Sequence, residues 1–421
     1  MIPNQWYAVL ESRDLPSGKP MGVKRLAQSL VLWRTAEGEV VCMKNRCAHR
    51  GTALEIGSLA RDRIVCAYHG FQYDKAGRCV RMPCAGAASI PSGLKVKTFP
   101  VREANGFIFV WWGEARESYP EIPWIEGFPT DPRTTLTRSE IWPFNYARLV
   151  ENNLDAHHWA FLHGSIMVGI GERVDDFEVT TRGNGIDARG TLRHAKSPAG
   201  AKGWDFRLAF QAPNVNLIKV TPRYQSLTMT TPVDEYTSWV AIRLYQTYVR
   251  VPVLRQMLDY YCNQFLFAVP QYRQDFPVFH TQTPRLTDLG TATPVQADRA
   301  LAAYLKMRRR LIDEAKAAQG PTVERASSRP RAEGYWNDSL NGHRGDASLA
   351  WADGKDRGRV HAEMAYPLPS LLPERERNVT KGRERGLGKA ALWTKNCLSF
   401  PLLVPSLVLS TVLDRWDRLR G

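Results

Sequence analysis

The two runs CAHRG (47–51) and CAYHG (66–70) determine how the first part of this chain is interpreted. They place Cys47 and His49 in one run, and Cys66 and His69 in the other, with sixteen residues between His49 and Cys66. Two thiolates and two imidazoles can bind zinc or an iron–sulfur cluster. A structural zinc site more often uses closely spaced cysteine pairs. One cysteine and one histidine from each loop suit a two-iron cluster in which cysteines hold one iron and histidines the other.

The spacing C-x-H-x16-C-x2-H, with Arg-Gly after the first histidine and Gly-Phe after the last, resembles the Rieske [2Fe–2S] domain. The resemblance implies that Cys47, His49, Cys66 and His69 bind the cluster. Residues 1–115 contain short apolar runs separated by turn residues, such as SLVLWR and VVCMKN around TAEGE. We therefore expect an all-β Rieske domain over 1–115.

The chain has seven cysteines, an odd number without the spacing of a disulfide framework, which favours a reducing compartment. Those outside the two runs match no ligand position and are expected to be ordinary buried thiols. They are Cys42, Cys79, Cys84, Cys262 and Cys397.

A second constellation lies in ENNLDAHHWAFLHG (151–164), where Asp155, His158 and His163 form D-x2-H-x4-H. The segment has the length and composition of a helix. On a regular helix, the two histidines would lie roughly 140° apart, so they can share one ion only if the helix bends or loosens between them. A histidine on such a helix is usually a core residue. The redox cluster in the same chain favours a mononuclear iron site instead.

An Fe(II) oxygenase site uses two histidines and one carboxylate, and leaves positions open for O2. The run QYRQDFPVFHTQTP (271–284) supplies Asp275 on a second helical stretch, with His280 as a rival ligand. Rieske oxygenases resemble this pattern, with an acidic ligand on a late helix followed by Val and Gln, here Val278 and Gln282. The family usually has an acidic residue just before the ligand, where this chain has Gln274.

The resemblance gives Asp155 a different role from that of a ligand. In Rieske oxygenases, the aspartate of this motif bridges a cluster histidine of one subunit and an iron histidine of the next. A carboxylate that accepts N–H bonds from both imidazoles fixes their orientation and tautomer, and shortens the electron path. The resemblance therefore implies a closed head-to-tail ring, commonly a homotrimer.

We expect an α+β protein in which the Rieske domain is followed by a helix-grip (START-like) catalytic domain with a curved antiparallel sheet. The resemblance covers roughly residues 1–285. The catalytic mononuclear iron domain is assigned to 116–310. Residues 311–390 are predicted to form an extended, partly disordered extension, and 391–421 an apolar C-terminal segment.

The run NCLSFPLLVPSLVLSTVL (396–413) has no charged residue, but two prolines interrupt it and it is short for a spanning helix. It can pack on protein or lie at a membrane surface. The N-terminus lacks the basic start and apolar core of a signal peptide, so we expect a cytoplasmic protein, with peripheral membrane association through this segment as an option.

The expected function is that of a Rieske-type non-haem iron oxygenase. The resemblance implies a [2Fe–2S] cluster, mononuclear non-haem Fe(II), O2, and electrons that come ultimately from NAD(P)H through a ferredoxin or flavin reductase. The reaction could be hydroxylation, demethylation, desaturation or oxidative cyclisation, for example in sterol or natural-product metabolism. The net charge of +15 suits docking of an acidic ferredoxin, and no nucleic-acid motif is present.

The substrate is expected to be large and hydrophobic, because Arg148 is the main basic residue near the iron motif. Candidates for an apolar lining can equally be sheet core, which we favour for most of them. They are Phe161, Phe206, Phe210, Leu217 and Tyr224.

Two rival classes remain open. A Rieske electron-transfer protein without its own oxygenase site would need only the first ~115 residues and would bind two irons. A zinc-binding module would be colourless and would use the four ligands at 47–69.

Overall fold

The computed structural model describes residues 1–318, except 87–88, 166, 168, 199, 222, 250, 262–268 and 288–292. The apolar segment expected at 391–421 and most of the expected extension lie outside the described residues. Among the described helices, none is both long and apolar enough to cross a membrane.

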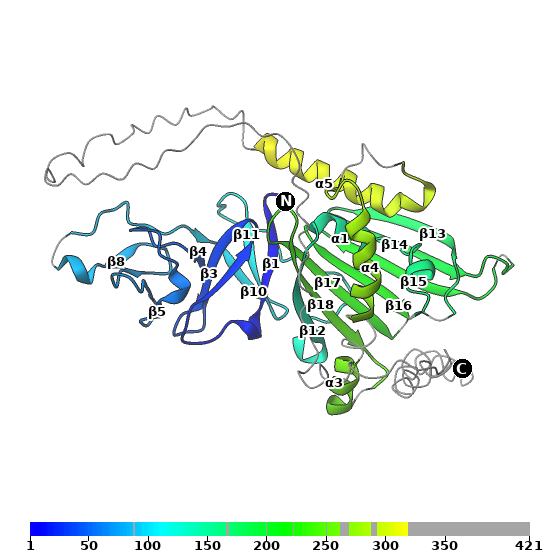
Figure 1. Ribbon diagram of the computed structural model, residues 1–421, viewed down its shortest axis with the longest axis horizontal. Helices are drawn as coiled ribbons and strands as arrows, with labels where there is room; N and C mark the ends of the chain where they lie inside the picture. The colour runs from blue at the N-terminus through cyan, green and yellow to red at the C-terminus, as the bar shows by residue number, and fades with distance from the viewer. Residues whose placement is uncertain are drawn as a thin grey trace, which may run out of the picture. The chain divides into compact units, whose positions relative to one another are not determined.

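The first domain is built from short antiparallel strands in three small sheets, with the orders β1-β11-β10, β2-β3-β4-β9 and β5-β6-β7-β8 (Figure 1). Their bounds are β1 (Gln5–Glu11), β2 (Met21–Arg25), β3 (Gln28–Arg34), β4 (Val40–Lys44), β5 (Ser58–Leu59), β6 (Ile64–Val65), β7 (Gln72–Tyr73), β8 (Cys79–Arg81), β9 (Thr98–Phe99), β10 (Val101–Ala104) and β11 (Phe107–Trp112). The short 3-10 helices are η1 (Ser12–Asp14), η2 (Leu54–Ile56) and η3 (Pro83–Ala85). The expected all-β Rieske architecture is therefore confirmed.

The second domain is one antiparallel sheet of seven strands in the order β12-β18-β17-β16-β15-β14-β13. The strands are β12 (Leu136–Trp142), β13 (Arg173–Arg182), β14 (Gly185–Arg193), β15 (Trp204–Gln211), β16 (Val215–Thr221), β17 (Tyr224–Pro232) and β18 (Ser238–Gln246). The helices are α1 (Tyr146–Asn153), α2 (Trp159–Leu162), α3 (Pro252–Tyr261), α4 (Val269–Thr281) and α5 (Arg299–Ala318), with η4 (Pro132–Thr134) and η6 (Gln296–Asp298). A large antiparallel sheet with few helices confirms the α+β fold class.

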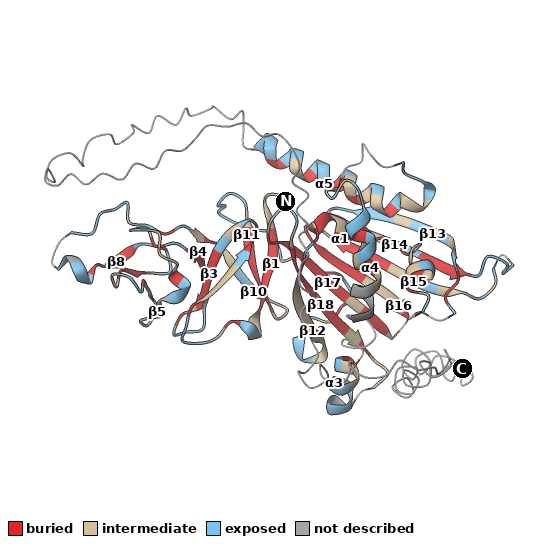
Figure 2. Ribbon diagram, in the orientation of Figure 1, coloured by how far each residue is buried: buried red, intermediate tan, exposed pale blue. Residues whose placement is uncertain are grey.

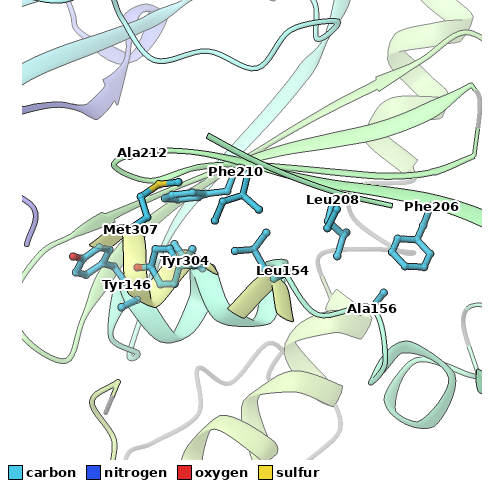
Figure 3. Close-up of a cluster of buried hydrophobic side chains, with 14 of the residues drawn as sticks. Tyr146, Leu154, Ala156, Phe206, Leu208, Phe210, Ala212, Tyr304 and Met307 are labelled. Carbon is cyan, nitrogen blue, oxygen red and sulfur yellow. The ribbon is translucent and has the colours of Figure 1, made fainter. Parts of the chain in front are cut away.

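Both faces of this sheet are buried, because alternate residues of each strand point to opposite sides. On the helix-covered face, Phe206, Leu208 and Phe210 of β15 pack against residues of α1 and α5, including Tyr146 and Tyr304 (Figure 3). Figure 2 shows buried residues along the strands and exposed ones along the outside of α5.

On the opposite face, Ala209, Leu217 and Met229 share a core with residues of the first domain, among them Trp6 and Phe107. The backbone N–H groups of Leu26 and Ala27 also donate to the carbonyls of Pro232 and Val233. The sheet therefore has a dry face against the first domain, and a helix-covered face on which a site can form.

Helix α5 runs through Ala318, so residues 311–318 are helical and not extended as predicted. Its buried residues recur at helical spacing as Ala300, Tyr304, Met307, Leu311 and Ala315. The intervening run KMRRR gives this segment a polar composition, which hides the apolar stripe when only composition is considered.

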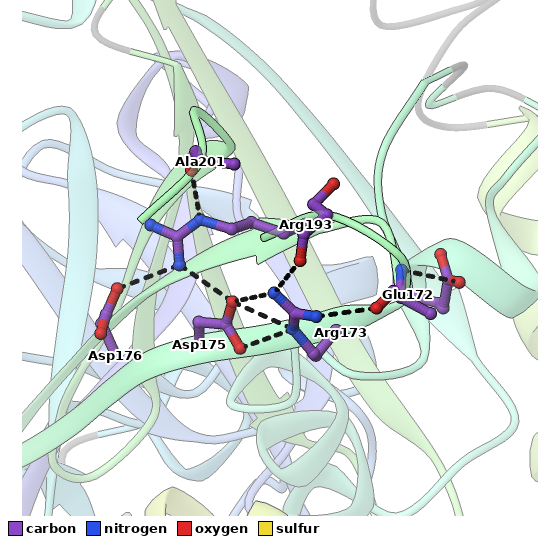
Figure 4. A network of polar contacts seen from close by, with 8 residues as sticks. Glu172, Arg173, Asp175, Asp176, Arg193 and Ala201 are labelled. Atoms are coloured by element: carbon purple, nitrogen blue, oxygen red, sulfur yellow. Dashed lines mark hydrogen bonds and ion pairs between the residues drawn. The ribbon is translucent and has the colours of Figure 1, made fainter. Parts of the chain in front are cut away.

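The far edge of the sheet is fixed by an ion-pair network at a bulge in β13 (Figure 4). Arg193 Nη1 lies 3.0 Å from a carboxylate oxygen of each of Asp175 and Asp176, and Arg173 Nε lies 2.9 Å from Asp175 Oδ1. Asp176 has a φ of 53°, a conformation that aspartate tolerates better than most residues. The network ties the edge strand to β14 where the register shifts.

The side chain of Asp259 allows the packing of α3 against the sheet to be tested. Its side chain is buried, and burial raises the pKa of the carboxyl to about 6, although a hydrogen bond to Gln246 opposes the shift. The folded state therefore binds a proton more tightly than the unfolded state, and stability falls as pH rises from about 4 to about 6. Replacing Asp259 with Asn should raise the free energy of unfolding at pH 8 by up to ~3 kcal/mol, and by little at pH 4.

Urea unfolding at the two pH values measures this difference. The exposed Asp313 on α5 is the matched control, and Asp313→Asn should change stability by less than ~0.5 kcal/mol at either pH. Equal effects of Asp259→Asn at pH 4 and pH 8 would contradict the assignment.

Candidate metal centres

The two Cys/His runs fold into loops with the same backbone hydrogen bonds. Cys47 N donates to Thr52 O, and Cys66 N donates to Phe71 O, each at 2.8 Å. Gly51 N and Gly70 N donate to the carbonyls of the two cysteines at 3.0 Å, with φ values of 80° and 69°. Each run therefore needs a glycine at its end, because this turn requires a left-handed residue.

The four predicted cluster ligands converge between these loops. Cys47 and Cys66 are buried and their thiol groups interact, while the rings of His49 and His69 lie 4.8 Å apart between centroids, with His49 exposed. A pair of thiols and a pair of imidazoles on two matching loops fit a two-iron cluster bound by cysteines on one side and histidines on the other.

Tyr73 is a further residue of this site, which the sequence did not single out. Its hydroxyl lies 3.0 Å from Cys47 Sγ in the buried interior. Such a hydroxyl can donate to the thiolate and stabilise the added electron of a reduced cluster. Of the other described cysteines, Cys42 and Cys79 are buried as expected, but Cys84 is exposed, contrary to prediction. Cys262 and Cys397 lie outside the described residues.

The predicted helix over the D-x2-H-x4-H motif is interrupted. Helix α1 starts at an Asn145 cap and ends at Asn153, and the four-residue α2 begins only at Trp159. In the break, the carboxylate of Asp155 accepts a hydrogen bond from His157 N at 2.7 Å. A side-chain acceptor for a nearby backbone N–H competes with helix continuation, which explains why the helix stops here.

His158 and His163 flank α2 as its N-cap and C-cap residues, so neither is bound to the geometry of a continuous helix. Their ring centroids lie 5.2 Å apart. His158 Nδ1 lies 3.0 Å from Asp155 Oδ2, and His163 Nδ1 lies 2.8 Å from Gln274 Oε1. Both rings are therefore held by Nδ1, and each leaves Nε2 as its metal-binding atom.

Asp275 on α4 completes the group. Ligand atoms of His158, His163 and Asp275 all lie within 4.8 Å of one another. His163 and Asp275 are buried, and Asp275 Oδ1 lies 3.3 Å from His163 Nε2, but makes no hydrogen bond within the described part of the chain. A buried carboxylate oxygen without a donor, facing two imidazole nitrogens, fits a divalent iron ion bound by two histidines and one carboxylate.

The charges around the site favour this arrangement. Burial alone would raise the pKa of Asp155, but hydrogen bonds from His157 and His158 hold that pKa far below its usual value. Burial alone would lower the pKa of His163, but Asp275 and Gln274 raise it above its usual value. Asp155 therefore stays ionised, and the position between His163 and Asp275 favours a positive charge, whether a proton or a metal ion.

Gln274 occupies the position where Rieske oxygenases usually have an acidic residue. Its Nε2 donates to Ser165 Oγ at 2.8 Å, which orients Oε1 toward His163 Nδ1. The neutral amide thus does what a carboxylate would do, because its Oε1 accepts a hydrogen bond from the Nδ1–H group of His163 and fixes the ring. The sequence signalled this residue only as a departure from the family pattern.

A cavity of about 40 Å³ adjoins Asp275 on the helix-covered face of the sheet. It is lined by Trp142, Leu149, Asn152, Asn153, Ile218, Ser226, Thr228, Ile242, Leu244 and Asp275. All five predicted lining residues lie elsewhere. Phe206 and Phe210 belong to the core under α1 and α5, Leu217 packs on the first domain, Tyr224 is buried outside this lining, and Phe161 is 78% exposed.

The remaining predicted residues surround the site without joining it. His280, the rival ligand, is exposed and packs its ring against Phe144 at 5.0 Å. Val278 is 41% exposed, and its carbonyl accepts from Gln282 N. Arg148 pairs with Glu151 and donates to the carbonyls of Pro284 and Leu286.

Comparison with known proteins identifies the first domain directly. The family model described as a Rieske [2Fe-2S] domain matches residues 5–100. The chain is 32% identical over 217 residues to protein TIC 55 of Arabidopsis thaliana, which is 50% of this chain and 39% of that protein. It is 35% identical over 165 residues to the methylxanthine N1-demethylase NdmA of Pseudomonas putida, which is 38% of this chain and 46% of that protein. The chain thus spans less than half the length of these curated relatives.

Solved structures share the fold beyond the first domain. Pseudomonas putida CBB5 NdmA matches with a TM-score of 0.58 at 22% identity, over 75% of this chain and 91% of that chain. A fluorene-bound oxygenase and ferredoxin complex of carbazole 1,9a-dioxygenase matches with a TM-score of 0.61 at 19% identity, over 73% of this chain and 90% of that chain. The seven-stranded sheet with its few helices is therefore a fold that oxygenases also use.

The contact between the Tyr73 hydroxyl and Cys47 Sγ predicts that removing this hydroxyl shifts the reduction potential of the cluster. Tyr73→Phe removes one hydrogen bond to a cysteine sulfur, worth about 1 kcal/mol, and should lower the potential by about 40 mV. Potentiometric titration followed by EPR measures this. Tyr68→Phe is the control, since Tyr68 is exposed and its hydroxyl should leave the potential unchanged. An unchanged reduction potential in Tyr73→Phe would show that the Tyr73 hydroxyl does not hydrogen-bond the sulfur of Cys47.

The hydrogen bond between Gln274 and His163 predicts that substitutions of Gln274 change the affinity of the mononuclear site for Fe(II) and leave the cluster unchanged. Gln274→Leu removes the acceptor for His163 Nδ1 and should weaken Fe(II) binding at the mononuclear site ~10- to 100-fold, whereas Gln274→Glu should retain binding. Fe(II) titration of protein stripped at this site measures both, with the cluster EPR signal as internal control. Wild-type affinity in Gln274→Leu would exclude the assigned role.

Proposed function

We propose that this chain, whose residues 5–100 match the Rieske [2Fe-2S] domain, is a Rieske non-haem iron oxygenase that uses O2 and external electrons to oxidise a hydrophobic substrate. The observation that supports this most strongly is the convergence of His158, His163 and Asp275 in a chain that also carries the cluster ligands. An electron carrier needs no second metal site of this kind, and nothing in the comparisons favours that alternative. Relatives named as a demethylase and as monooxygenases support the oxygenase assignment.

In this proposal Cys47, His49, Cys66 and His69 hold the [2Fe–2S] cluster, and His158, His163 and Asp275 hold Fe(II). When bound, the cluster supplies electrons one at a time and the mononuclear iron binds and activates O2. The chain itself orients the two imidazoles through Asp155 and Gln274. It also supplies a small cavity beside Asp275, lined by residues of the sheet and of α1.

Asp155 is proposed to link neighbouring subunits. Its carboxylate bonds His157 and His158 but remains 38% exposed, so it can accept a further N–H from outside the chain. His49 is exposed on the first domain and could supply that donor from an adjacent copy. This pairing favours a closed ring, such as a homotrimer, in which each cluster serves the iron of its neighbour.

Electrons are proposed to arrive from a ferredoxin or a flavin reductase, ultimately from NAD(P)H. The net charge of +15 suits an acidic donor, and one solved structure that shares this fold is itself an oxygenase and ferredoxin complex. For a lipophilic substrate, the uncharged run at 396–413, outside the described residues, would allow association with a membrane surface. Hydroxylation, demethylation, desaturation and oxidative cyclisation all remain compatible with this site.

Iron content tests the proposal. Wild-type protein purified without oxygen should contain about three irons per chain, and His158→Ala, His163→Ala and Asp275→Ala about two each, with the Rieske EPR signal intact. Substrate-dependent O2 consumption should be lost in all three variants, because they retain the cluster but cannot hold the iron.

His280→Ala is the matched control for these variants. It removes a nearby histidine that lies outside the three-residue group, so it should keep about three irons and wild-type O2 consumption. Two irons per chain in the wild-type protein would support an electron-transfer protein, and zinc without colour would support the binding module.

A further inference from the structure

A set of polar side chains is buried on the helix-covered face of the sheet, beside the proposed iron site. Asn216 on β16 is fully buried, and neither its Oδ1 nor its Nδ2 has a hydrogen-bond partner within the described part of the chain. Thr230 on β17 is also fully buried, and its hydroxyl is likewise unpartnered there. Nothing in the iron-binding arrangement uses either residue.

Strand alternation places these groups next to the cavity. Val215 and Leu217 pack toward the first domain, so Asn216 between them points to the helix-covered face, as does Ile218. Asn216 stands directly opposite Thr228 in the register of β16 and β17. Ile218 and Thr228 both line the cavity that contains Asp275. The Asn216 amide therefore lies within side-chain reach of that cavity, because opposed side chains on one face are close neighbours.

An unpaired buried amide is costly for a fold to retain. Leaving a buried donor or acceptor unsatisfied costs roughly 1–3 kcal/mol, and in native proteins such groups usually bind water or a ligand. A cavity of about 40 Å³ has room for water. A bound substrate that displaced this water would have to offer matching polar atoms or lose affinity.

The chemistry of the lining limits what that substrate can be. Leu149, Ile218, Ile242 and Leu244 supply apolar surface, whereas Ser226, Thr228 and two asparagines of α1 supply neutral polar groups. Among the described residues that line the cavity, none is Lys, Arg or His. Arg148 is held by Glu151 and by backbone carbonyls. A carboxylate would therefore find no cationic side chain among these lining residues, while a neutral carbonyl or hydroxyl would find both donors and acceptors.

We propose that Asn216 and Thr228 form a subsite that hydrogen-bonds one neutral carbonyl or hydroxyl group of an otherwise apolar substrate, and so fixes which carbon faces the iron. This deepens the proposed function and rests on it. Only the part of the substrate that carries this polar group enters the cavity of about 40 Å³, beside Ile218, Ile242 and Leu244, and the polar group is directed toward β16 and β17. The subsite selects neutral oxygenated hydrophobic molecules over both carboxylated and purely hydrocarbon ones.

The first test needs no substrate. Asn216→Leu replaces an unpartnered amide with an apolar group of similar size, so the iron-loaded full-length protein should unfold at the same or a higher temperature. The matched control is Asn214→Leu. Asn214 is equally buried, but its Nδ2 donates to Thr230 O and Thr231 Oγ1, so this change should lower the unfolding temperature. Equal destabilisation by the two changes would assign Asn216 a structural role and overturn the proposal.

The second test measures binding with compounds that share one ring skeleton: fluorene, 9-fluorenone and 9-fluorenone-4-carboxylate. Equilibrium dialysis against the full-length protein should show 9-fluorenone bound ~10-fold more tightly than fluorene, the gain expected for one hydrogen bond, and the carboxylate bound more weakly than 9-fluorenone. Asn216→Leu should bind fluorene and 9-fluorenone equally.

Two results of this second test would refute the subsite: no preference for 9-fluorenone in a protein that holds about three irons, or no binding of any of the three compounds. Binding is measured separately from iron content and O2 consumption. A protein with two irons that still prefers 9-fluorenone would therefore contradict the oxygenase proposal but not the polar subsite.

Discussion

The hydrogen bonds of the Asp155 carboxylate are the interactions on which the proposed iron site depends. The carboxylate accepts a hydrogen bond from the backbone of His157 and lies within bonding distance of the rings of His157 and His158. The first bond favours the end of the helix, and the last holds the imidazole of His158 by Nδ1. A continuous helix would separate the two histidines of the motif by roughly 140°, and the site would not form. One side chain thus links local backbone structure to the chemistry of the centre.

The sheet determines where that centre can lie. Its strands bury alternate residues against the first domain and under the helices, so large apolar residues such as Phe210 and Leu217 become core on one side or the other. Beside Asp275, small polar residues such as Ser226 and Thr228 join large apolar ones such as Trp142 and Leu149 in the lining of the cavity. The cavity lies at the junction of β16–β18 with α1 and α4.

Buried polar groups distinguish the working parts of this protein from its scaffold. The Arg173–Asp175–Arg193 network is satisfied by its own members and serves the edge of the sheet. Asp275 Oδ1 and the Asn216 amide have no hydrogen-bond partner among the described residues, and both lie at or beside the cavity. Unsatisfied buried groups are destabilising, so a ligand that hydrogen-bonds these two groups would offset that cost.

The sequence alone determined the chemistry of the first domain, because a metal site demands particular residue types at fixed short spacing, and Cys47, His49, Cys66 and His69 meet that demand within twenty-three residues. It also singled out His158, His163 and Asp275, the three residues of the proposed iron site. It could not show that the helix stops at Asn153, that Gln274 holds His163, or that Asn216 stands opposite Thr228 in the neighbouring strand. These facts depend on side chains from strands and helices distant in the chain. Only tertiary packing decides which of them meet, since spacing along a sequence fixes local geometry but not contacts between separate elements.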